Sequence, residues 1–554
     1  MSEASTEQIT QQEAATTGML IAYHAQQAPE RMAVTTVYGE RTFGQLNSRI
    51  NQLARVFRQA GLQPDDAVAL LLVNRCEFLE VYYAAMRTGL RVTPINWHLT
   101  GDDAAYIVDN CEAKGFVADV ECATTAQQAL SQASGVKIAL AVGGEIEGFE
   151  DYEETVDQQP SHNIDNPTSG SQMLYTSGTT GRPKGVYRDR VALRRAIAAQ
   201  AGAAQAATQP AQAAPAPAAR APVATAAGGA AGYNPDTDRT LCTGPGYHAA
   251  PLAFNILSPI AQGVGIVMMD RWDAEECLRL VAEYKITHTH MVATMFHRLL
   301  SLPEEVRSNY DSSSLRYVLH GAAPCPVHVK QAMMDWLGPV IYEYYAATEG
   351  GGGFFIGPED WLKKPGSVGK APDANNNKIV DDEGNEVPQG EIGTIYFQAP
   401  QVGRFEYYKD SKKTADSYMG DFFTLGDMGY FDADGYLFLT GRNAETIISG
   451  GVNIYPQEAD NVLLKHPAIA DVCTIGIPNE EWGEEVKSVV QLNEGYSESN
   501  EMAEELITFS REMLPAYKSP RSIDFVAELP RLPSGKIQRR KVREPYWAGM
   551  DKQI

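Results

Sequence analysis

One segment of the sequence combines hydroxyl, glycine and lysine side chains in a pattern that suits phosphate chemistry. Residues 175–186 read YTSGTTGRPKGV, with four Ser or Thr hydroxyls, three glycines and one lysine, Lys184. Glycines let backbone N–H groups approach phosphate oxygens, the hydroxyls add donors, and the lysine adds charge. The P-loop pattern G-x-x-x-x-G-K-[ST] does not fit, because Pro183 stands where its second glycine is required. The string is too specific for an ordinary Gly/Thr-rich surface turn, so we predict a phosphate-binding loop of another type.

Five further strings follow in sequence order. They are YHAAP at 247–251, YYAATE at 344–349, TLGD at 424–427, GR at 441–442 with SGGVNIYP at 449–456, and PSGK at 533–536. With the loop at 175–186, this ordered set resembles the motifs of the adenylate-forming superfamily, which contains acyl-CoA synthetases, firefly-type luciferases and peptide-synthetase adenylation domains. The resemblance covers nearly the whole chain.

The resemblance implies an enzyme that runs two half-reactions on a small-molecule carboxylic acid, with ATP, Mg²⁺ and coenzyme A. A carboxylate attacks the α-phosphate of ATP and forms an acyl-adenylate, and a thiol then displaces AMP to form a thioester. A carboxylate is already a nucleophile, so the chemical obstacle is repulsion between anions, which fixed cations and a metal relieve. By resemblance, the catalytic residues are Lys536, Thr348, Glu349 and His248.

Each of these residues has an expected role that comes from the resemblance. Lys536 bridges the carboxylate and the α-phosphate, and Thr348 hydrogen-bonds the α-phosphate. His248 lies near the acyl group. Glu349 and Thr176 are the expected Mg²⁺ ligands, and magnesium prefers one or two carboxylate oxygens together with ATP phosphates.

A larger set is expected to contact the nucleotide. Asp427 would accept the ribose hydroxyls, Arg442 would contact ribose or phosphate, and Tyr345 would stack on adenine, although a core tyrosine is the alternative there. The expected cofactor-binding residues are Thr176, Ser177, Gly178, Thr179, Thr180, Gly181, Lys184, Gly321, Ala322, Ala323, Tyr344, Tyr345, Ala346, Asp427, Arg442, Gly450 and Gly451.

The chain departs from the superfamily pattern at two positions. Ala346 stands where many relatives have glycine, and the added methyl group shapes the acyl pocket. Ala444 stands at the hinge, where Asp or Lys is common. The superfamily's carboxy-terminal domain swings about this hinge between the half-reactions. Alanine does not forbid that swing, so we predict that both half-reactions proceed.

The identity of the acid is less well indicated. The expected pocket stretches, Tyr247–Asn255, Met291–Leu299, Gly321–Pro324 and Ala346–Phe355, are mostly apolar or small. This favours an apolar fatty acid or a bulky polycyclic acid, such as a steroid side-chain acid. The four glycines at 350–353 either leave an open wall for a bulky acid or only make a tight turn.

Three alternatives share the nucleotide motifs. The first is a stand-alone adenylating enzyme that loads a carrier protein, and the second is a luciferase-type oxygenase. The third is a non-catalytic nucleotide-binding protein, which the intact charged residues of the motifs argue against.

Composition limits the class of protein and its partners. The chain has 554 residues, which suggests three or four lobes, and a net charge of −24. Such an acidic balance argues against a general nucleic-acid binder. Seven cysteines without a CxxC pair indicate reduced thiols. We expect a cytoplasmic protein without a signal peptide or integral membrane segment. A homodimer is left open.

The elements that carry these motifs alternate strand and helix, which predicts an α/β fold with parallel sheets covered on both faces. Strands are expected at Asp65–Leu72 and Arg91–Asn96, with a helix at Phe78–Thr88 between them. Short strands are expected at Asp421–Asp427 and Gly429–Leu439, with a hairpin turn at Phe431–Tyr436. Further helices are expected at Gln457–Lys465 and Asn500–Met513.

The predicted organisation has two domains. Residues 1–442 form a large AMP-binding domain with two parallel-type α/β sheets and a small β subdomain, and residues 443–554 form a small mobile α+β domain. Residues 196–232 are rich in alanine and interrupted by prolines, which excludes one continuous helix. We interpret this segment as a mobile insertion without chemistry.

Overall fold

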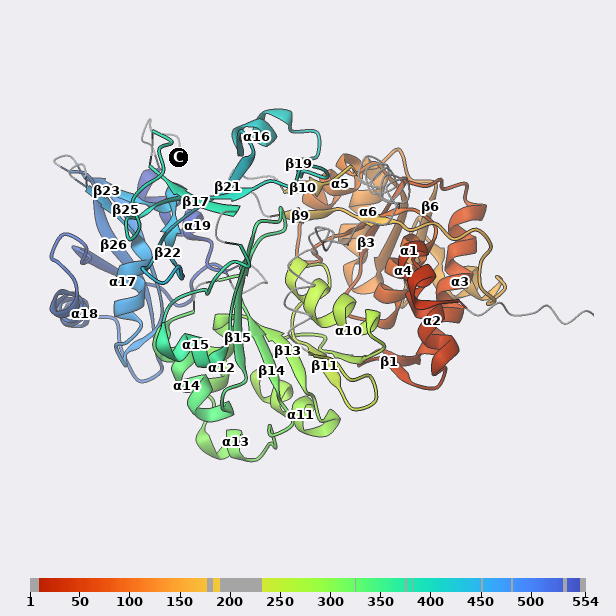
Figure 1. Cartoon of the computed structure of the whole chain (residues 1–554), viewed down its shortest axis with the longest axis horizontal. Coiled ribbons are helices and arrows are strands. Elements are labelled where there is room, and N and C mark those ends of the chain that lie inside the picture. Colours follow the sequence, from red (N-terminus) through yellow and green to blue (C-terminus); the bar gives the residue numbers. More distant parts are fainter. Residues whose placement is uncertain are drawn as a thin grey trace, which may run out of the picture.

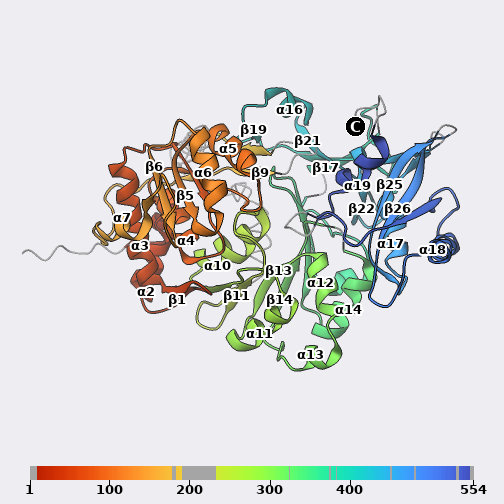
Figure 2. The same cartoon turned by 180° about the vertical axis from the view of Figure 1, so that it is seen from behind.

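The computed structural model describes residues 9–176, 183–189, 232–323, 325–373, 376–381, 383–449, 452–479, 482–531 and 536–548. The insertion expected at 196–232 lies outside these residues except for Gly232. In both views the amino-terminal segments lie at one end of the long axis and the carboxy-terminal segments at the other (Figures 1 and 2).

A six-stranded sheet near the amino terminus pairs all its strands in parallel. In spatial order its strands are β7 (Glu150–Asp151), β6 (Ile138–Val142), β5 (Ala113–Asp119), β3 (Ala67–Leu71), β4 (Arg91–Pro94) and β8 (Ser171–Gln172). Every residue of β3 is buried, as the apolar sequence AVALL requires of a strand covered on both faces.

Helices cover both faces of this sheet. They are α3 (Phe43–Gln59), α4 (Cys76–Arg87), α5 (Gly101–Asn110), α6 (Ala123–Gln132) and α7 (Tyr152–Asp157), with the 3₁₀ turn η1 (Val120–Cys122). Helix α2 (Leu20–Gln27) packs instead against α3, and α1 (Gln11–Thr17) packs against α2. Helices α3 and α4 share a hydrophobic core with strands of two sheets, and α4 is buried along nearly its whole length. These two helices therefore join the first sheet to the second.

The second sheet has eight strands, and its six central strands are parallel. In spatial order they are β16 (Gly352–Ile356), β15 (Ile341–Ala346), β14 (Tyr317–His320), β13 (His288–Met291), β11 (Arg239–Cys242), β12 (Gly265–Met268), β1 (Met32–Thr36) and β2 (Gly39–Thr42). The edge strands β16 and β2 pair antiparallel to their neighbours.

The second sheet also has helices on its faces. They are the π-helix η2 (Pro251–Leu257), α10 (Ser258–Ala261), α11 (Ala274–Tyr284), α12 (Ala293–Leu300), α13 (Glu304–Ser308), α14 (Val327–Leu337) and α15 (Pro358–Lys363). The side chains of Met295, Phe296 and Leu299 on α12 pack into the core that also holds α11 and α14. These residues of the stretch Met291–Leu299, which was expected to line the acyl pocket, therefore belong to the hydrophobic core on one face of the second sheet.

A small β region follows. A five-stranded antiparallel sheet contains β17 (Asn377–Val380), β18 (Gly393–Gln398), β21 (Phe422–Phe431), β20 (Tyr418–Met419) and β22 (Leu437–Arg442). A three-stranded sheet contains β19 (Glu406–Tyr407), β10 (Lys184–Tyr187) and β9 (Leu174–Thr176), and helix α16 spans Ser411–Asp416. The hairpin turn predicted between Phe431 and Tyr436 is confirmed, with Gly435 at φ +80°.

The last sheet contains β24 (Val452–Ile454), β23 (Ile447–Ser449), β26 (Gly483–Leu492), β25 (Ile469–Asn479) and β27 (Ser522–Phe525). Helices α17 (Pro456–Leu463), α18 (Asn500–Met513) and α19 (Arg539–Trp547) pack with it, and the 3₁₀ turn η4 (Asn443–Glu445) precedes it. Two parallel-type sheets, a β region and a small α+β tail thus match the predicted fold class.

Most expected elements are present within a few residues, but one division is wrong. Residues 421–427 and 429–431 do not belong to separate strands, because β21 runs continuously from Phe422 to Phe431. A β-bulge between Met428 and Gly429 lets the strand continue across the expected boundary.

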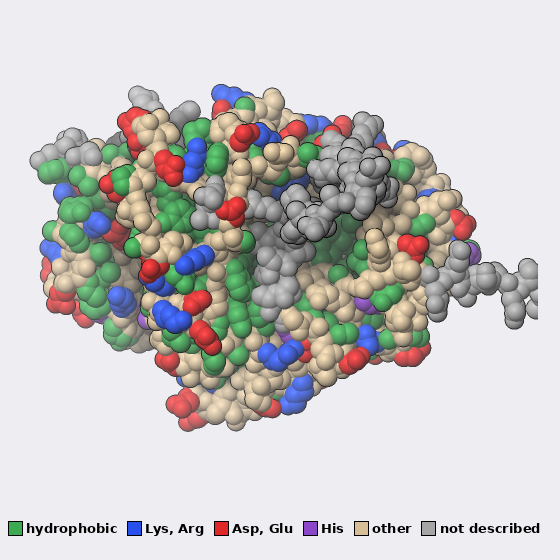
Figure 3. Space-filling model, viewed as in Figure 1, with side chains coloured by type: hydrophobic (Ala, Val, Ile, Leu, Met, Phe, Trp, Pro, Cys, Tyr) green, Lys and Arg blue, Asp and Glu red, His purple; other side chains and the backbone are tan. Residues whose placement is uncertain are grey.

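None of the helices in the described part of the chain combines the length and hydropathy needed to cross a membrane. All seven cysteines are free thiols. On the face shown in Figure 3, the basic and acidic side chains of the described residues are interspersed and do not form a basic stripe of the kind that binds nucleic acid.

Candidate active site

The candidate site begins at the carboxyl ends of β14 and β15, where ligands bind in open α/β sheets. Gly321 and Ala322 follow β14, while Tyr344, Tyr345 and Ala346 end β15. A Cβ on Gly321 would lie 2.5 Å from the Tyr344 ring, and Ala322 has φ +66°. This loop is therefore pressed against β15, and only glycine fits at its first position.

Tyr345 and two charged residues form a hydrogen-bonded group opposite this edge. The Tyr345 hydroxyl donates to Asp427 Oδ2 at 2.6 Å, and Arg442 Nε donates to Asp427 Oδ1 at 3.0 Å. Asp427 and Arg442 are paired across β21 and β22. Burial and the Asp427 charge raise the pKa of Tyr345. The ring of Tyr345 packs near Phe354 and Phe397, so it also contributes to a core cluster.

Lys536 arrives from the other end of the chain. Desolvation lowers the pKa of Lys536, and the Arg442 charge lowers it further, while Glu445 and Asp427 act in the opposite direction. Lys536 in turn lowers the pKa of His248. The tail lysine therefore lies within electrostatic range of His248, Asp427 and Arg442, which the sequence separates by hundreds of residues.

The residues on both sides of Lys536 hold it in place. Arg531 and Ile537 pair across the segment that contains Lys536. Three residues after the lysine, Arg539 bonds Glu445 at 3.1 Å and Asp460 at 2.8 Å. Glu445 belongs to the 3₁₀ turn that contains Ala444, so helix α19 is tied to the residues just after Arg442.

Two histidines lie on the side of the site where the acid is expected. The Tyr344 hydroxyl and His290 Nε2 are 3.2 Å apart, and the His290 ring stacks on Phe254 at 5.7 Å. Desolvation lowers the pKa of His248 to about 4 and that of His290 to about 3, with smaller contributions from Lys536 and from neighbouring histidines. Both rings are therefore neutral at pH 7.

These two pKa values predict a pH-dependent stability. An unfolded histidine has a pKa near 6.5, so between about pH 6.5 and 4 the unfolded chain binds more protons than the folded one. Stability is therefore retained above pH 6.5 and lost as the pH falls below it, by about 1 kcal/mol per pH unit for each histidine. Thermal unfolding midpoints between pH 7 and 5 measure this loss. His290→Gln should weaken the dependence, and an unchanged dependence would contradict the assignment.

Glu349 lies beyond β15, before four glycines with φ of +92°, +78°, +70° and +71°. A Cβ on Gly352 would lie 2.4 Å from the Tyr345 carbonyl oxygen, so the chain turns tightly through Gly350 and Gly351 and enters β16 at Gly352 with φ still positive. Glu349 Oε1 accepts a hydrogen bond from the Tyr407 hydroxyl at 3.0 Å. The Lys184 ammonium lies 5.4 Å from the centre of the Tyr407 ring. Tyr407 therefore lies next to both Glu349 and Lys184, the lysine of the predicted phosphate loop.

The structure describes the strands on either side of the phosphate loop, but most of the loop itself lies outside the described residues. Thr176 on β9 pairs with Lys184 on β10. Ser177, Gly178, Thr179, Thr180 and Gly181 lie outside the described residues, as do Gly450 and Gly451. The structure thus brings together Lys536, His248, Asp427, Arg442 and Tyr345 in one group and Lys184, Glu349 and Tyr407 in another. The turn after Glu349 returns the chain from β15, which carries Tyr345, to β16.

Sequence reasoning missed several neighbours of the predicted residues. Tyr407, His290 and Glu445 were not singled out, nor was Arg188, which donates to the carbonyl oxygens of Glu349 at 2.6 Å and Thr348 at 3.4 Å. The only local signal for Arg188 is its place four residues after Lys184.

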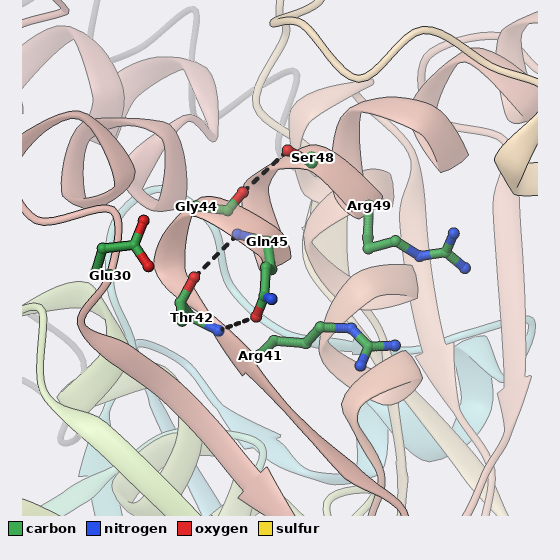
Figure 4. A pocket seen from close by; sticks show the side chains of 7 residues that line it. All are labelled: Glu30, Arg41, Thr42, Gly44, Gln45, Ser48 and Arg49. Atoms are coloured by element: carbon green, nitrogen blue, oxygen red, sulfur yellow. Dashed lines mark hydrogen bonds between the residues drawn. The ribbon is translucent and has the colours of Figure 1, made fainter.

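A separate surface hollow of about 570 Å³ lies at the start of α3, on the amino-terminal lobe (Figure 4). It contains two arginines, but Arg41 and Arg49 bond the buried Glu80 at 3.1 and 3.3 Å. The side chain of Glu80 has no exposed surface. Because both cations already have this partner, the hollow is a weaker candidate for an anionic ligand.

The profile of the AMP-binding enzyme family matches residues 21–408, and the profile of the AMP-binding enzyme C-terminal domain matches residues 458–536. The first match covers more than half of the sequence. The chain therefore belongs to the AMP-binding enzyme family, and the resemblance to the adenylate-forming superfamily is confirmed.

Individual relatives agree with this. A fatty acid–acyl-carrier-protein ligase from Streptomyces coeruleorubidus is 27% identical over 539 residues, which is 96% of each chain. A 2-succinylbenzoate–CoA ligase from Bacillus licheniformis is 30% identical over 520 residues, covering 94% of this chain and 98% of its own. A solved anthranilate CoA ligase in complex with anthranoyl-AMP has the same fold, with a TM-score of 0.80 at 24% identity over 95% of this chain and 97% of its own.

Proposed function

We propose that the protein is an ATP-dependent, AMP-forming carboxylic acid–CoA ligase. The observation that carries this proposal is the Asp427 carboxylate, which accepts hydrogen bonds from Tyr345 and Arg442 beside the carboxyl edge of the second sheet, with Lys536 within electrostatic range. A cation from the tail beside a carboxylate that can accept ribose hydroxyls is the arrangement that adenylate formation needs. Membership of the AMP-binding enzyme family supports it.

In the first half-reaction the acid's carboxylate attacks the α-phosphate of ATP, and pyrophosphate leaves. Asp427 would accept the ribose hydroxyls, and Arg442 would hold the Asp427 carboxylate in place. Lys536 would stand between the carboxylate and the α-phosphate, where its charge reduces the repulsion between two anions. The neutral ring of His248 beside Lys536 would border the acyl group without adding a second fixed charge.

The surroundings of Glu349 fit Mg²⁺ bound together with ATP. Among the described residues no group of three or more His, Cys, Asp or Glu side chains can hold a metal ion. A single carboxylate with Lys184 nearby suits magnesium that takes most of its ligands from phosphates and water. Glu349 would hold the ion, with the Thr176 hydroxyl as a second candidate ligand, and the bound ion would neutralise charge on the leaving pyrophosphate.

The proposed acid is an apolar monocarboxylate, a fatty acid or a bulky polycyclic acid such as a steroid side-chain acid. The hydrophobic cluster beside His290 and Tyr344 contains aromatic and small or apolar side chains, namely Ala250, Phe254, Tyr317, Leu319, Tyr342, Ala346 and Phe355. Because His248 and His290 are neutral at pH 7, they offer no cation for a second carboxylate. The name of the fatty acid–acyl-carrier-protein ligase fits this class, whereas 2-succinylbenzoate, named for the other relative, is an aromatic dicarboxylate.

For the second half-reaction we propose that residues 443–554 move as a unit about the turn Asn443–Glu445, so that coenzyme A reaches the acyl-adenylate. Ala444 is exposed in this turn. A swing would have to break the contacts of Glu445 with Arg539 or carry both residues together. Joint movement is consistent with the sequence, because Glu445 and Arg539 both follow Arg442.

A second candidate function is the loading of a carrier protein, because one relative is named as a fatty acid–acyl-carrier-protein ligase. A panel of carboxylic acids from short aliphatic to steroid distinguishes the candidates. Pyrophosphate release, AMP release and thioester formation are measured separately with coenzyme A, with a carrier protein, or with neither.

We expect pyrophosphate release with apolar monocarboxylates and AMP release with a thioester only when coenzyme A is present. Thioester formation on the carrier protein alone would favour the second candidate. Adenylate that accumulates without any thioester would contradict a two-step ligase, and ATP binding without turnover of any acid would indicate a non-catalytic protein.

A further inference from the structure

Glu349 is held at both ends by residues that belong to none of the sequence motifs. We propose that Arg188 and Tyr407 are positioning residues that fix the Glu349 carboxylate relative to the phosphate loop. This inference rests on the proposed function, in which Glu349 binds the Mg²⁺ that accompanies ATP.

Arg188 holds the backbone of the Thr348–Glu349 segment. Its Nη2 donates to the Glu349 carbonyl oxygen at 2.6 Å and to the Thr348 carbonyl oxygen at 3.4 Å. The next residue is Gly350, where an added Cβ would lie 3.1 Å from Arg188 Nη2, so the guanidinium is packed directly against the turn. A hydrogen bond from a charged donor to a carbonyl is stronger than one between neutral groups.

The turn after Glu349 needs such an anchor. Glycine has the largest backbone freedom of all residues, and four glycines in succession follow Glu349. Without a fixed point beside it, Glu349 could shift with this turn. Arg188 supplies the fixed point from the end of β10, whose first residue is Lys184. Strand β10 therefore fixes the position of both the Glu349 backbone and Lys184, the lysine of the phosphate loop.

Tyr407 holds the other end of Glu349, its carboxylate. The hydroxyl donates to Glu349 Oε1 at 3.0 Å, and the ring lies 5.4 Å from the Lys184 ammonium. Tyr407 is on β19, where it pairs with Val186 of β10. Its side chain is buried, which restricts its movement away from Glu349.

Tyr407 thus lies on the small sheet β19–β10–β9, and Arg188 directly follows its strand β10; the strands β9 and β10 also flank the phosphate loop. We infer that this sheet aligns Glu349 so that it would hold the divalent cation that accompanies ATP.

The test uses Arg188→Met, Arg188→Lys and Tyr407→Phe in the full-length protein. Each is compared with a matched control. Arg271→Met removes an arginine whose side chain is 83% exposed, and Tyr408→Phe removes a neighbouring hydroxyl that instead bonds Glu112 at 2.6 Å. Calorimetry measures ATP binding as a function of Mg²⁺ concentration, adenylation gives kcat and KM for the acid, and thermal unfolding reports folding.

We expect Arg188→Met to raise the Mg²⁺ concentration at half-maximal ATP binding by about tenfold and to lower adenylation kcat by about 10- to 100-fold, as misplacement by about 1 Å does. The KM for the acid should stay within about twofold, because no acid contact is changed. Arg188→Lys should recover part of the loss, since it restores a charged donor without the planar fork. Tyr407→Phe should act in the same direction with a smaller effect, and both controls should match the wild type.

Wild-type Mg²⁺ dependence and kcat in both Arg188→Met and Tyr407→Phe would overturn the inference. A raised KM for ATP with unchanged Mg²⁺ dependence would also overturn it, because it would mean a direct contact with the nucleotide. If Arg188→Met does not fold, Tyr407→Phe against Tyr408→Phe decides the question alone. If the wild type forms no adenylate with any acid while these variants still shift Mg²⁺-dependent ATP binding, the proposed reaction fails and the positioning role stands.

Discussion

Lys536→Ala abolishes most adenylate formation while ATP still binds; this is the largest effect that we expect from any single substitution in the chain. The lysine is the charged group that the tail contributes between the acid and the α-phosphate, and the desolvation that lowers its pKa also strengthens its interaction with anions. Loss of one such preorganised group costs about 10²–10³ in rate. Pyrophosphate release with saturating acid measures the rate, and calorimetry measures ATP binding.

The matched control is Lys541→Ala, which removes an exposed lysine from helix α19 a few residues farther along the chain. It should leave both measurements unchanged. If Lys536→Ala adenylates the acid at the wild-type rate, the role assigned to this lysine is wrong, whatever happens to the second half-reaction.

Asp427→Asn should give the second-largest effect, mainly in the KM for ATP. The carboxylate now accepts from the Tyr345 hydroxyl and from Arg442 Nε, and its side chain is only 13% exposed. Asparagine keeps the shape but offers ribose one neutral acceptor instead of two charged oxygens. It also leaves the Arg442 guanidinium without the carboxylate. Since a hydrogen bond to a charged group contributes about 1.5–3 kcal/mol, the KM for ATP should rise by about 10- to 100-fold.

Asp421→Asn is the control for this substitution. Asp421 precedes β21 and bonds Arg404, but its side chain is 80% exposed. Steady-state kinetics with varied ATP should show no change for Asp421→Asn. A wild-type KM for ATP in Asp427→Asn would mean that the ribose lies elsewhere.

The sequence allowed the fold to be predicted where local patterns have one physical explanation. The apolar run that became β3 is buried on both faces, so its strand could be recognised without any knowledge of its partners. The Asp-Gly turn before Tyr436 was equally clear. By contrast, the division of β21 between residues 427 and 429 was wrong, because the bulge that keeps this strand continuous depends on its pairing with the neighbouring strand.

Only those residues of the candidate site that belong to sequence motifs could be predicted. Tyr345 shows a limit of this approach, since it both bonds Asp427 and packs among Phe354 and Phe397, and a motif cannot separate the two roles. Arg188 and Tyr407 could not be found, because their contacts with Glu349 span 161 and 58 residues of sequence. Such contacts depend on how sheets meet, which no local spacing encodes.

The most direct test of the central claim is a crystal structure of the protein with a hydrolysis-resistant acyl-adenylate analogue. We predict that the ribose hydroxyls lie within hydrogen-bond distance of the Asp427 carboxylate. The adenine should lie between Gly321–Ala323 and Tyr345, and the group that replaces the phosphate should lie beside Thr348 and Lys536. A nucleotide bound away from Asp427 and Thr348, or one that leaves Lys536 remote with the tail in the arrangement described above, would contradict the account.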